Sequence, residues 1–228
     1  MTFYRLYTNL RKLQDQRTYP YDYQLPDKIF FTPEFWKQVI TLYKATRSDE
    51  HERAISVFWA DGDLIFSSVV RGTTSSVTPS NQVDVKYDYS RYKGYLTKRV
   101  YVDGDIVIEK DIYYKNVPKK IEVKYLFNMH THPPHQYENG TYYSFFSLQD
   151  IKSLLGSGAV ITGMIGDKLW LLIRTVKSPS DTGTITEPEI NMESLYERLH
   201  IVTYYGDFNA PLTRFRPYQP NSSSSSQQ

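Results

Sequence analysis

Two histidines and an aspartate in the middle of the chain have the types and spacing to hold a metal ion, and a serine lies close to the aspartate in the sequence. His130 and His132 alternate, and residues i and i+2 of an extended strand point to the same face, so the two imidazoles can lie side by side. Two prolines follow and cannot continue a central strand, so the histidine pair is expected at a strand end. Ser147 and Asp150 open an apolar helical pattern and share one helix face. Two imidazoles and one carboxylate, with one position left open, are the ligands that a catalytic zinc ion needs.

Apolar patterns on both sides of these residues predict the elements that must position them. Residues 121–130 are a predicted strand that delivers the first histidine. Residues 147–155 are a predicted helix, in which Ser147 can act as the N-cap and Asp150 falls in the first turn. Helix initiation is therefore the ordinary explanation of both residues. A hairpin of strong strand formers, over residues 159–175, follows the helix.

The first third of the chain predicts a helix and a hairpin on either side of Glu52. Thr32-Pro33 favours a helix start, because Thr is a good N-cap and Pro suits the first helical position. The apolar stripe of this helix ends near Thr46. Residues 54–59 and 64–70 are predicted strands of a hairpin. Glu52 stands immediately before the first of them, between a capped helix and a core strand.

The length of 228 residues allows one domain with a sizeable core. Residues 98–115 predict a hairpin, and the apolar spacing over residues 192–203 predicts a helix. Residues 72–97 are weakly patterned and favour neither helix nor strand. We expect an N-terminal extension over residues 1–28, one domain over 29–205 with an insertion at about 72–118, and a disordered Ser-rich tail over 206–228.

Composition and charge disfavour several classes of protein. The formal net charge of +2 is too small to favour a nucleic-acid or membrane-surface partner. The chain has no cysteine, which excludes disulfides, cysteine zinc fingers and a thiol nucleophile, and leaves His, Asp and Glu as the strong metal ligands. The N-terminus lacks the pattern of a signal peptide and no apolar run is long enough to span a membrane, so we expect a cytoplasmic protein.

The order of these features resembles the JAMM (MPN+) metalloprotease family over roughly residues 29–175. The matching residues are Glu52, His130-Thr131-His132-Pro133 and Ser147-Leu148-Gln149-Asp150. The resemblance implies an α/β fold of the α+β type, a cytidine-deaminase-like mixed curved sheet flanked by helices, with a β-hairpin insertion. The separation of His132 from Ser147 by residues 133–146 is longer than is usual in the family. Glu50 is the alternative to Glu52, which is preferred because it adjoins the strand.

The resemblance also implies a role for each residue. His130, His132 and Asp150 would bind Zn²⁺ and leave a position for water, whose pKa zinc lowers towards about 7. Glu52 would take a proton from that water and pass it to the leaving amine. Ser147 would donate a hydrogen bond to the developing oxyanion. The expected substrate is an amide bond at the C-terminal tail of ubiquitin or a ubiquitin-like protein.

Several alternatives stay open on the residues alone. The same fold could hydrolyse the amide of another peptide or of a small-molecule conjugate, or serve as a non-catalytic scaffold that binds partners. A structural zinc site is disfavoured, because only three good ligands are present. His135 is a weaker candidate for a fourth ligand. The loop over residues 133–146 would lie over the site and gate or contact the substrate, and the 98–115 hairpin would receive an extended peptide. The oligomeric state is left open.

Overall fold

The computed structural model describes residues 1–60, 63–80, 82–88, 95–103, 106–109, 123–137, 140–143, 145–157 and 159–217. The helices are α1 (Phe3–Asp15), α2 (Pro33–Asp49), α3 (Leu148–Gly156) and α4 (Met192–Glu197), with the 3-10 turns η1 (Asp22–Gln24) and η3 (Glu187–Glu189). The strands are β1 (Lys28–Ile29), β2 (Arg53–Ala60), β3 (Asp63–Phe66), β4 (Val70–Arg71), β5 (Gln82–Asp88), β6 (Tyr95–Asp103), β7 (Ile106–Glu109), β8 (Val123–Thr131), β9 (Pro134–Tyr137), β10 (Gly140–Tyr143), β11 (Ile161–Ile165), β12 (Leu169–Arg174), β13 (Ile201–Gly206) and β14 (Leu212–Arg214).

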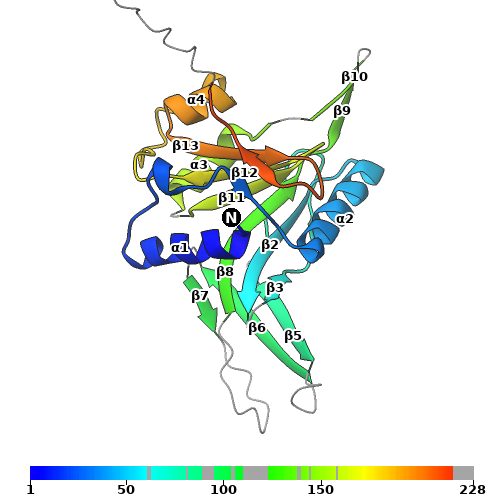
Figure 1. The fold of residues 1–228 in the computed structure, drawn as a ribbon. Coiled ribbons are helices and arrows are strands. Elements are labelled where there is room, and N and C mark those ends of the chain that lie inside the picture. Colours follow the sequence, from blue (N-terminus) through cyan, green and yellow to red (C-terminus); the bar gives the residue numbers. More distant parts are fainter. Residues whose placement is uncertain are drawn as a thin grey trace, which may run out of the picture.

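The chain forms a curled mixed sheet flanked by helices, as the expected α/β class requires (Figure 1). The nine-stranded sheet has the order β1-β14-β13-β12-β11-β8-β2-β3, and β4 also pairs with β2. β8 and β11 are parallel, whereas β8 and β2 are antiparallel. Parallel neighbours need a crossover connection, and here the crossover contains α3. The start of α3 therefore lies at the sheet edge where β8 ends.

Two buried clusters cover the two faces of the sheet. Adjacent strand residues point to opposite faces, and the two clusters divide β12 in this way, with Leu171 and Ile173 in one and Leu172 in the other. The first cluster receives the apolar stripes of α1 and α2, and the second receives those of α3 and α4. The sheet is thus the middle layer between two layers of helices.

Two smaller sheets extend from this body. The β9–β10 hairpin projects at one end and the three-stranded β5–β6–β7 sheet at the opposite end (Figure 1). The expected hairpin over 98–115 corresponds to β6 and β7, and its remaining residues lie outside the described part of the chain. The undecided stretch 72–97 contains β5, which pairs with β6.

The start of α2 follows its sequence signals, whereas its end lies beyond the expected position. The Thr32 side chain accepts a hydrogen bond from the Phe35 N–H at 3.3 Å. The helix passes Thr46 and ends at Asp49, where Glu50 takes a left-handed conformation with φ 57°. The predicted strand over 64–70 is divided between β3 and β4, which both pair with β2.

The helix predicted over residues 192–203 is wrong in its second half. α4 ends at Glu197, and Ile201 begins β13, which lies between β12 and β14. The run from residue 201 to 205 is rich in β-branched and aromatic residues, which favour strands. Pairing with two neighbouring strands outweighs the helical spacing of Leu195, Leu199 and Val202.

The boundary expected at the C-terminal end of the domain also needs correction. The tail was expected to begin at residue 206, but β14 belongs to the main sheet. Its Arg214 is buried and donates hydrogen bonds to the carbonyls of Asp22 and Leu25. At the other end, α1 buries Leu6 and Leu10 in the first cluster. The expected N-terminal extension is thus packed on the domain, as predicted, and shares its core. Only residues 218–228 of the expected tail lie outside the described part.

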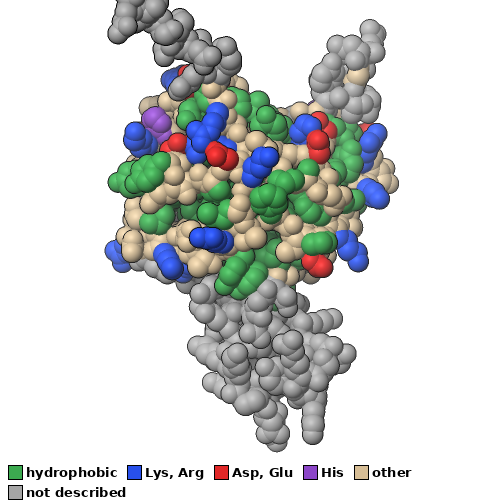
Figure 2. Space-filling view, in the orientation of Figure 1, with side chains coloured by type: hydrophobic (Ala, Val, Ile, Leu, Met, Phe, Trp, Pro, Cys, Tyr) green, Lys and Arg blue, Asp and Glu red, His purple; other side chains and the backbone are tan. Residues whose placement is uncertain are grey.

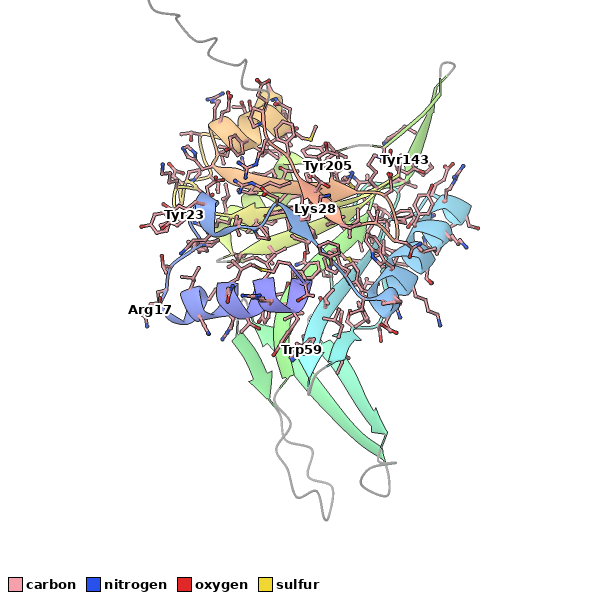
Figure 3. The ribbon with its side chains drawn as sticks, viewed as in Figure 1. Arg17, Tyr23, Lys28, Trp59, Tyr143 and Tyr205 are labelled. Atoms are coloured by element: carbon pink, nitrogen blue, oxygen red, sulfur yellow. The ribbon has the colours of Figure 1, made fainter. Side chains whose placement is uncertain are left out.

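The surface facing the viewer carries hydrophobic side chains in separate patches between polar and charged groups (Figure 2). Trp59, labelled in Figure 3, stacks on Tyr4 with ring centroids 4.2 Å apart. None of the described helices is both long enough and apolar enough to cross a membrane.

Candidate metal centre

The end of β8 presents both histidines on one face of the sheet. His130 pairs with Ala54 of β2 and with Met164 of β11, and the His132 N–H donates to the Ile165 carbonyl at 3.0 Å. Each histidine is 8% exposed, and their Nε2 atoms lie 2.9 Å apart. The strand therefore delivers two imidazoles that face one another, as the alternating spacing predicts.

The first turn of α3 brings a carboxylate to these imidazoles. Asp150 Oδ1 lies 3.4 Å from His130 Nε2, and Asp150 Oδ2 lies 4.0 Å from His132 Nε2. Ser147 caps the helix and holds this carboxylate: its N–H and hydroxyl donate to Asp150 Oδ2 at 2.7 and 2.8 Å. Helix initiation and orientation of a candidate ligand are thus combined in one pair of residues.

Opposing effects act on the Asp150 carboxyl. Burial raises its pKa, but the hydrogen bond and charge of His130 and the two hydrogen bonds from Ser147 outweigh burial and lower the pKa to about 2. The carboxylate is therefore ionised at neutral pH, which is the state that a metal ligand requires.

The three side chains fit a metal ion by geometry and by chemistry. One ligand atom from each of His130, His132 and Asp150 lies within 4.8 Å of the others. Ligand atoms bound to one tetrahedral zinc at about 2.0–2.1 Å would lie about 3.3 Å from one another. The two Nε2 atoms lie 2.9 Å apart, and they lie 3.4 Å from Oδ1 and 4.0 Å from Oδ2 of the carboxylate, respectively, so all of these distances are close to that value. Two nitrogens and one oxygen suit a transition metal better than calcium or magnesium, which prefer all-oxygen sites.

Glu52 reaches the same site because of the register between β2 and β8. It precedes Ala54 by two residues, as His132 follows His130 by two, so antiparallel pairing of Ala54 with His130 directs all three titratable side chains to one face. Glu52 is buried. Burial raises the pKa of its carboxyl, which the charge of His130 lowers and that of Asp150 raises further.

Glu52 and Glu50 occupy different positions relative to the candidate ligands. The Glu52 N–H donates to the Thr73 carbonyl at 2.7 Å, and the Glu52 carbonyl accepts from the Gly72 N–H at 2.8 Å. These bonds hold the backbone of Glu52 against the segment that follows β4. Glu50 is instead exposed at the end of α2 and does not line the cavity described next.

The five candidate residues lie in the wall of one cavity of about 520 Å³. Glu52, His130, His132, Ser147 and Asp150 line it together. Its remaining walls come from residues 74–77, from Pro133 and His135, from the two aromatic residues before α3, from Gln149 of α3 and from Glu187 of η3. No lysine or arginine is among the described residues that line it.

The loop over residues 133–146 forms part of the cavity wall. His135 on β9 pairs with Tyr142 and lines the cavity, but the metal-binding cluster found among the described residues contains His130, His132 and Asp150 only. Phe146 is buried edge-on to the His130 ring, with centroids 6.4 Å apart. The turn expected at residues 139–140 lies partly outside the described residues.

The base of the β9–β10 hairpin is attached to α2. The hydroxyls of Tyr143 and Tyr43 lie 3.1 Å apart, and Arg47 donates to the Tyr43 hydroxyl at 3.1 Å. Burial and the hydrogen bond with the Tyr43 hydroxyl raise the pKa of Tyr143 to about 12. Tyr143, labelled in Figure 3, also packs on Gly166, where an added Cβ would lie 3.1 Å from the Tyr143 Cβ.

Two parts of the site were not predicted from the sequence. The wall over residues 74–77 comes from a loop-like stretch that carries no periodic signal. The second part is the buried hydroxyl of Thr131, which accepts a hydrogen bond from the Arg53 N–H. The available signal in the sequence was its position between the two histidines, because a residue between two strand neighbours that share a face points to the opposite face.

Comparisons with family models, with curated proteins and with solved structures return no match. The resemblance to the JAMM family therefore rests on the five candidate residues, their order in the chain and the elements that carry them.

Proposed function

We propose that this chain is a zinc-dependent hydrolase of amide bonds, a metallopeptidase of the JAMM type. The observation that carries the proposal is one cavity in which the ligand atoms of His130, His132 and Asp150 converge beside the buried Glu52 and the hydroxyl of Ser147. Metal ligands, a carboxylate base and a hydrogen-bond donor are the groups that hydrolysis of an amide needs at neutral pH.

His130, His132 and Asp150 are the residues that would hold the metal. Zinc is the preferred ion because imidazole nitrogen and carboxylate oxygen in a set of three are typical of catalytic zinc sites. When bound, zinc supplies a Lewis acid and an acidified water molecule. The ionised state of Asp150 supports this role, since its pKa is lowered to about 2.

Glu52 is the proposed general base. Its burial raises the pKa of the carboxyl, which brings a glutamate closer to the neutral range in which proton transfer in both directions is efficient. The carboxylate would accept a proton from water and deliver it to the nitrogen of the leaving amine. Its backbone is held by Thr73 and Gly72, which supports a fixed position beside the ligands.

Ser147 is the proposed donor to the oxyanion. In this structure its hydroxyl donates to Asp150 Oδ2. A hydroxyl has one proton to donate, so donation to the substrate requires the hydroxyl to rotate away from Asp150. The Ser147 N–H remains on Asp150 in either case and keeps the carboxylate oriented.

The cavity favours a neutral chain over an anionic ligand. Its described lining contains the carboxylates of Glu52, Asp150 and Glu187 and no lysine or arginine. The hydroxyls of residues 74–76 and two phenylalanines make up much of the remaining wall. An extended peptide segment suits such a lining, which supports the tail of ubiquitin or a ubiquitin-like protein as the leading substrate. The amide of another peptide or of a neutral small-molecule conjugate is the alternative.

A cleavage screen tests the proposal. The purified chain is incubated with ubiquitin-like fusions, isopeptide conjugates and short peptides, with and without a zinc chelator. We expect hydrolysis of at least one class, lost with the chelator and restored by added zinc. Zinc-loaded protein that cleaves none of these substrates, yet captures one of them without turnover, would favour the alternative of a non-catalytic binding module.

A further inference from the structure

Thr131 is a buried hydroxyl placed between the two histidine ligands. Because neighbours on a strand point to opposite faces, its side chain points away from the cavity. It is 0% exposed. A hydroxyl in that position must be hydrogen-bonded, since burial of an unpaired polar group is costly.

The hydroxyl of Thr131 connects β8 to two other elements. It accepts a hydrogen bond from the Arg53 N–H at 2.8 Å, and it lies 2.6 Å from the hydroxyl of Thr46 on α2. The pairing of β2 with β8 reaches Ala54 and His130. Beyond that pair, the Thr131 side chain takes the N–H of Arg53, so the connection between the two strands extends one residue closer to Glu52.

The side chain of Arg53 extends this network at the outer side. Its two terminal nitrogens donate to the two oxygens of Asp49 at 2.8 and 2.7 Å, and one of them also donates to Thr46 Oγ1 at 3.3 Å. Arg71 on β4 donates to the same carboxylate at 3.0 Å. The end of α2, the start of β2, β4 and the end of β8 are thus joined by one set of hydrogen bonds.

The network lies directly behind the proposed catalytic groups. Arg53 follows Glu52 in the chain, and Thr131 lies between His130 and His132. The hydrogen bond from Arg53 to Thr131 is therefore a short physical connection between the backbone of the proposed base and the strand that carries two metal ligands. Loss of this hydrogen bond would remove the contact between the two strands that lies closest to Glu52.

We propose that Thr131 is a positioning residue, whose hydroxyl sets the placement of Glu52 relative to His130 and His132 through the Arg53 N–H and Thr46. The proposal rests on the hydrolase function proposed above. Thr131 does not contact the substrate; it acts through the backbone on both sides of the site. Groups behind a metal site that orient its ligands typically change metal affinity or activity by about 10–100-fold when they are mutated.

The test compares Thr131→Val, which keeps the shape and removes the hydroxyl, with Thr131→Ser, which keeps the hydroxyl. Thr203→Val on β13 is the matched control, because Thr203 is also 0% exposed and its hydroxyl has no hydrogen-bond partner among the described residues. The measurements are zinc affinity by competition with a chromophoric chelator, amide hydrogen exchange at Arg53, and kcat and KM.

For Thr131→Val we expect zinc affinity to fall about 10–100-fold. Exchange at Arg53 should be faster, and kcat should fall while KM stays near the wild-type value. Thr131→Ser should restore zinc affinity and kcat to within about threefold of wild type, as expected when the same hydrogen bonds are available. Thr203→Val should change none of these quantities.

Wild-type zinc affinity and kcat in Thr131→Val would overturn the positioning role, as would equal losses in Thr203→Val. Failure of Thr131→Ser to rescue would overturn it as well. If Thr131→Val does not fold, Thr46→Val removes the second partner of the same hydroxyl and is judged by the same measurements. Wild-type protein that binds no zinc would refute the hydrolase proposal itself, and the positioning role with it.

Discussion

The Nε2 atoms of His130 and His132 face one another at 2.9 Å. Two nitrogen lone pairs repel at this distance, so the arrangement requires either a shared proton or a cation that binds both. In the proposed centre a metal ion would compete with protons for these nitrogens, as ligand atoms that must be deprotonated generally require.

Removal of the two imidazoles should abolish metal binding. Purified protein is expected to carry about one zinc per chain, as for a single three-ligand site, and the double variant His130→Ala/His132→Ala should carry none. Metal content by mass spectrometry measures this. His135→Ala is the matched control, because His135 lines the same cavity outside the ligand group. Stoichiometric zinc in the double variant would contradict the proposed centre.

Substitution of the proposed base should separate catalysis from metal binding. Glu52→Gln keeps the size of the side chain and removes the proton acceptor, so we expect bound zinc to remain and kcat to fall about 10²–10⁴-fold. Glu50→Gln is the control, since Glu50 is exposed at the end of α2. A loss of activity in Glu50→Gln with full activity in Glu52→Gln would show that the other glutamate is the base.

Ser147 has two proposed roles that different substitutions can separate. Ser147→Ala removes both the N-cap and the hydroxyl, and loss of a cap costs about 1 kcal/mol of stability, whereas Gly at an N-cap costs only about a few tenths. The free energy of unfolding of Ser147→Gly should therefore be close to that of wild type. In both variants kcat should fall about 10²–10³-fold, because the hydroxyl donor is lost. Denaturant unfolding and steady-state kinetics measure the two effects. A wild-type kcat in Ser147→Gly would refute the role of Ser147 as an oxyanion donor, and helix capping would be its remaining role.

Asp49 should contribute stability that depends on pH. The hydrogen bond from Arg53 is the largest favourable effect on this carboxyl; with the other hydrogen bonds it outweighs burial and lowers the pKa of Asp49 well below its usual 3.8. A carboxyl with a lowered folded-state pKa stabilises the fold above its unfolded pKa, and this stability is lost as the pH falls. Asp49→Asn should thus be destabilised at neutral pH, and the difference from wild type should shrink below about pH 4.

Unfolding of metal-free protein from pH 7 to pH 3 measures this difference without interference from the metal centre. The control is Asp167→Asn, because Asp167 is exposed in the turn between β11 and β12. A deficit of Asp49→Asn that is the same at every pH would mean that the carboxylate charge contributes nothing, and that the variant acts through packing alone.

The three candidate metal ligands could be brought together from local patterns, because the position of each depends on a short-range rule. Alternation on a strand places His130 and His132 on one face, and an N-cap followed by an acidic residue three positions on places Asp150 in the first turn of a helix. The crossover between parallel strands then brings the helix start to the strand end. The expected order of strands and helices around the site was accordingly close to the fold.

Long-range pairing decided the features that local patterns could not. Residues 201–203 share the helical spacing of α4, yet they form β13 because two neighbouring strands pair with them. Likewise, β14 belongs to the sheet only through its partner strands, so its short sequence carries no signal of its own.

By itself, the sequence determined which residue types are available for a metal and which of them share a strand or a helix, since these properties follow from backbone periodicity. The tertiary structure alone decided that Glu52 rather than Glu50 lines the cavity, and that the Thr131 hydroxyl accepts a hydrogen bond from Arg53, the residue after Glu52. Both depend on the register of β2 against β8, which joins residues 78 positions apart. Such a register arises from packing of the whole core, and no local pattern specifies it.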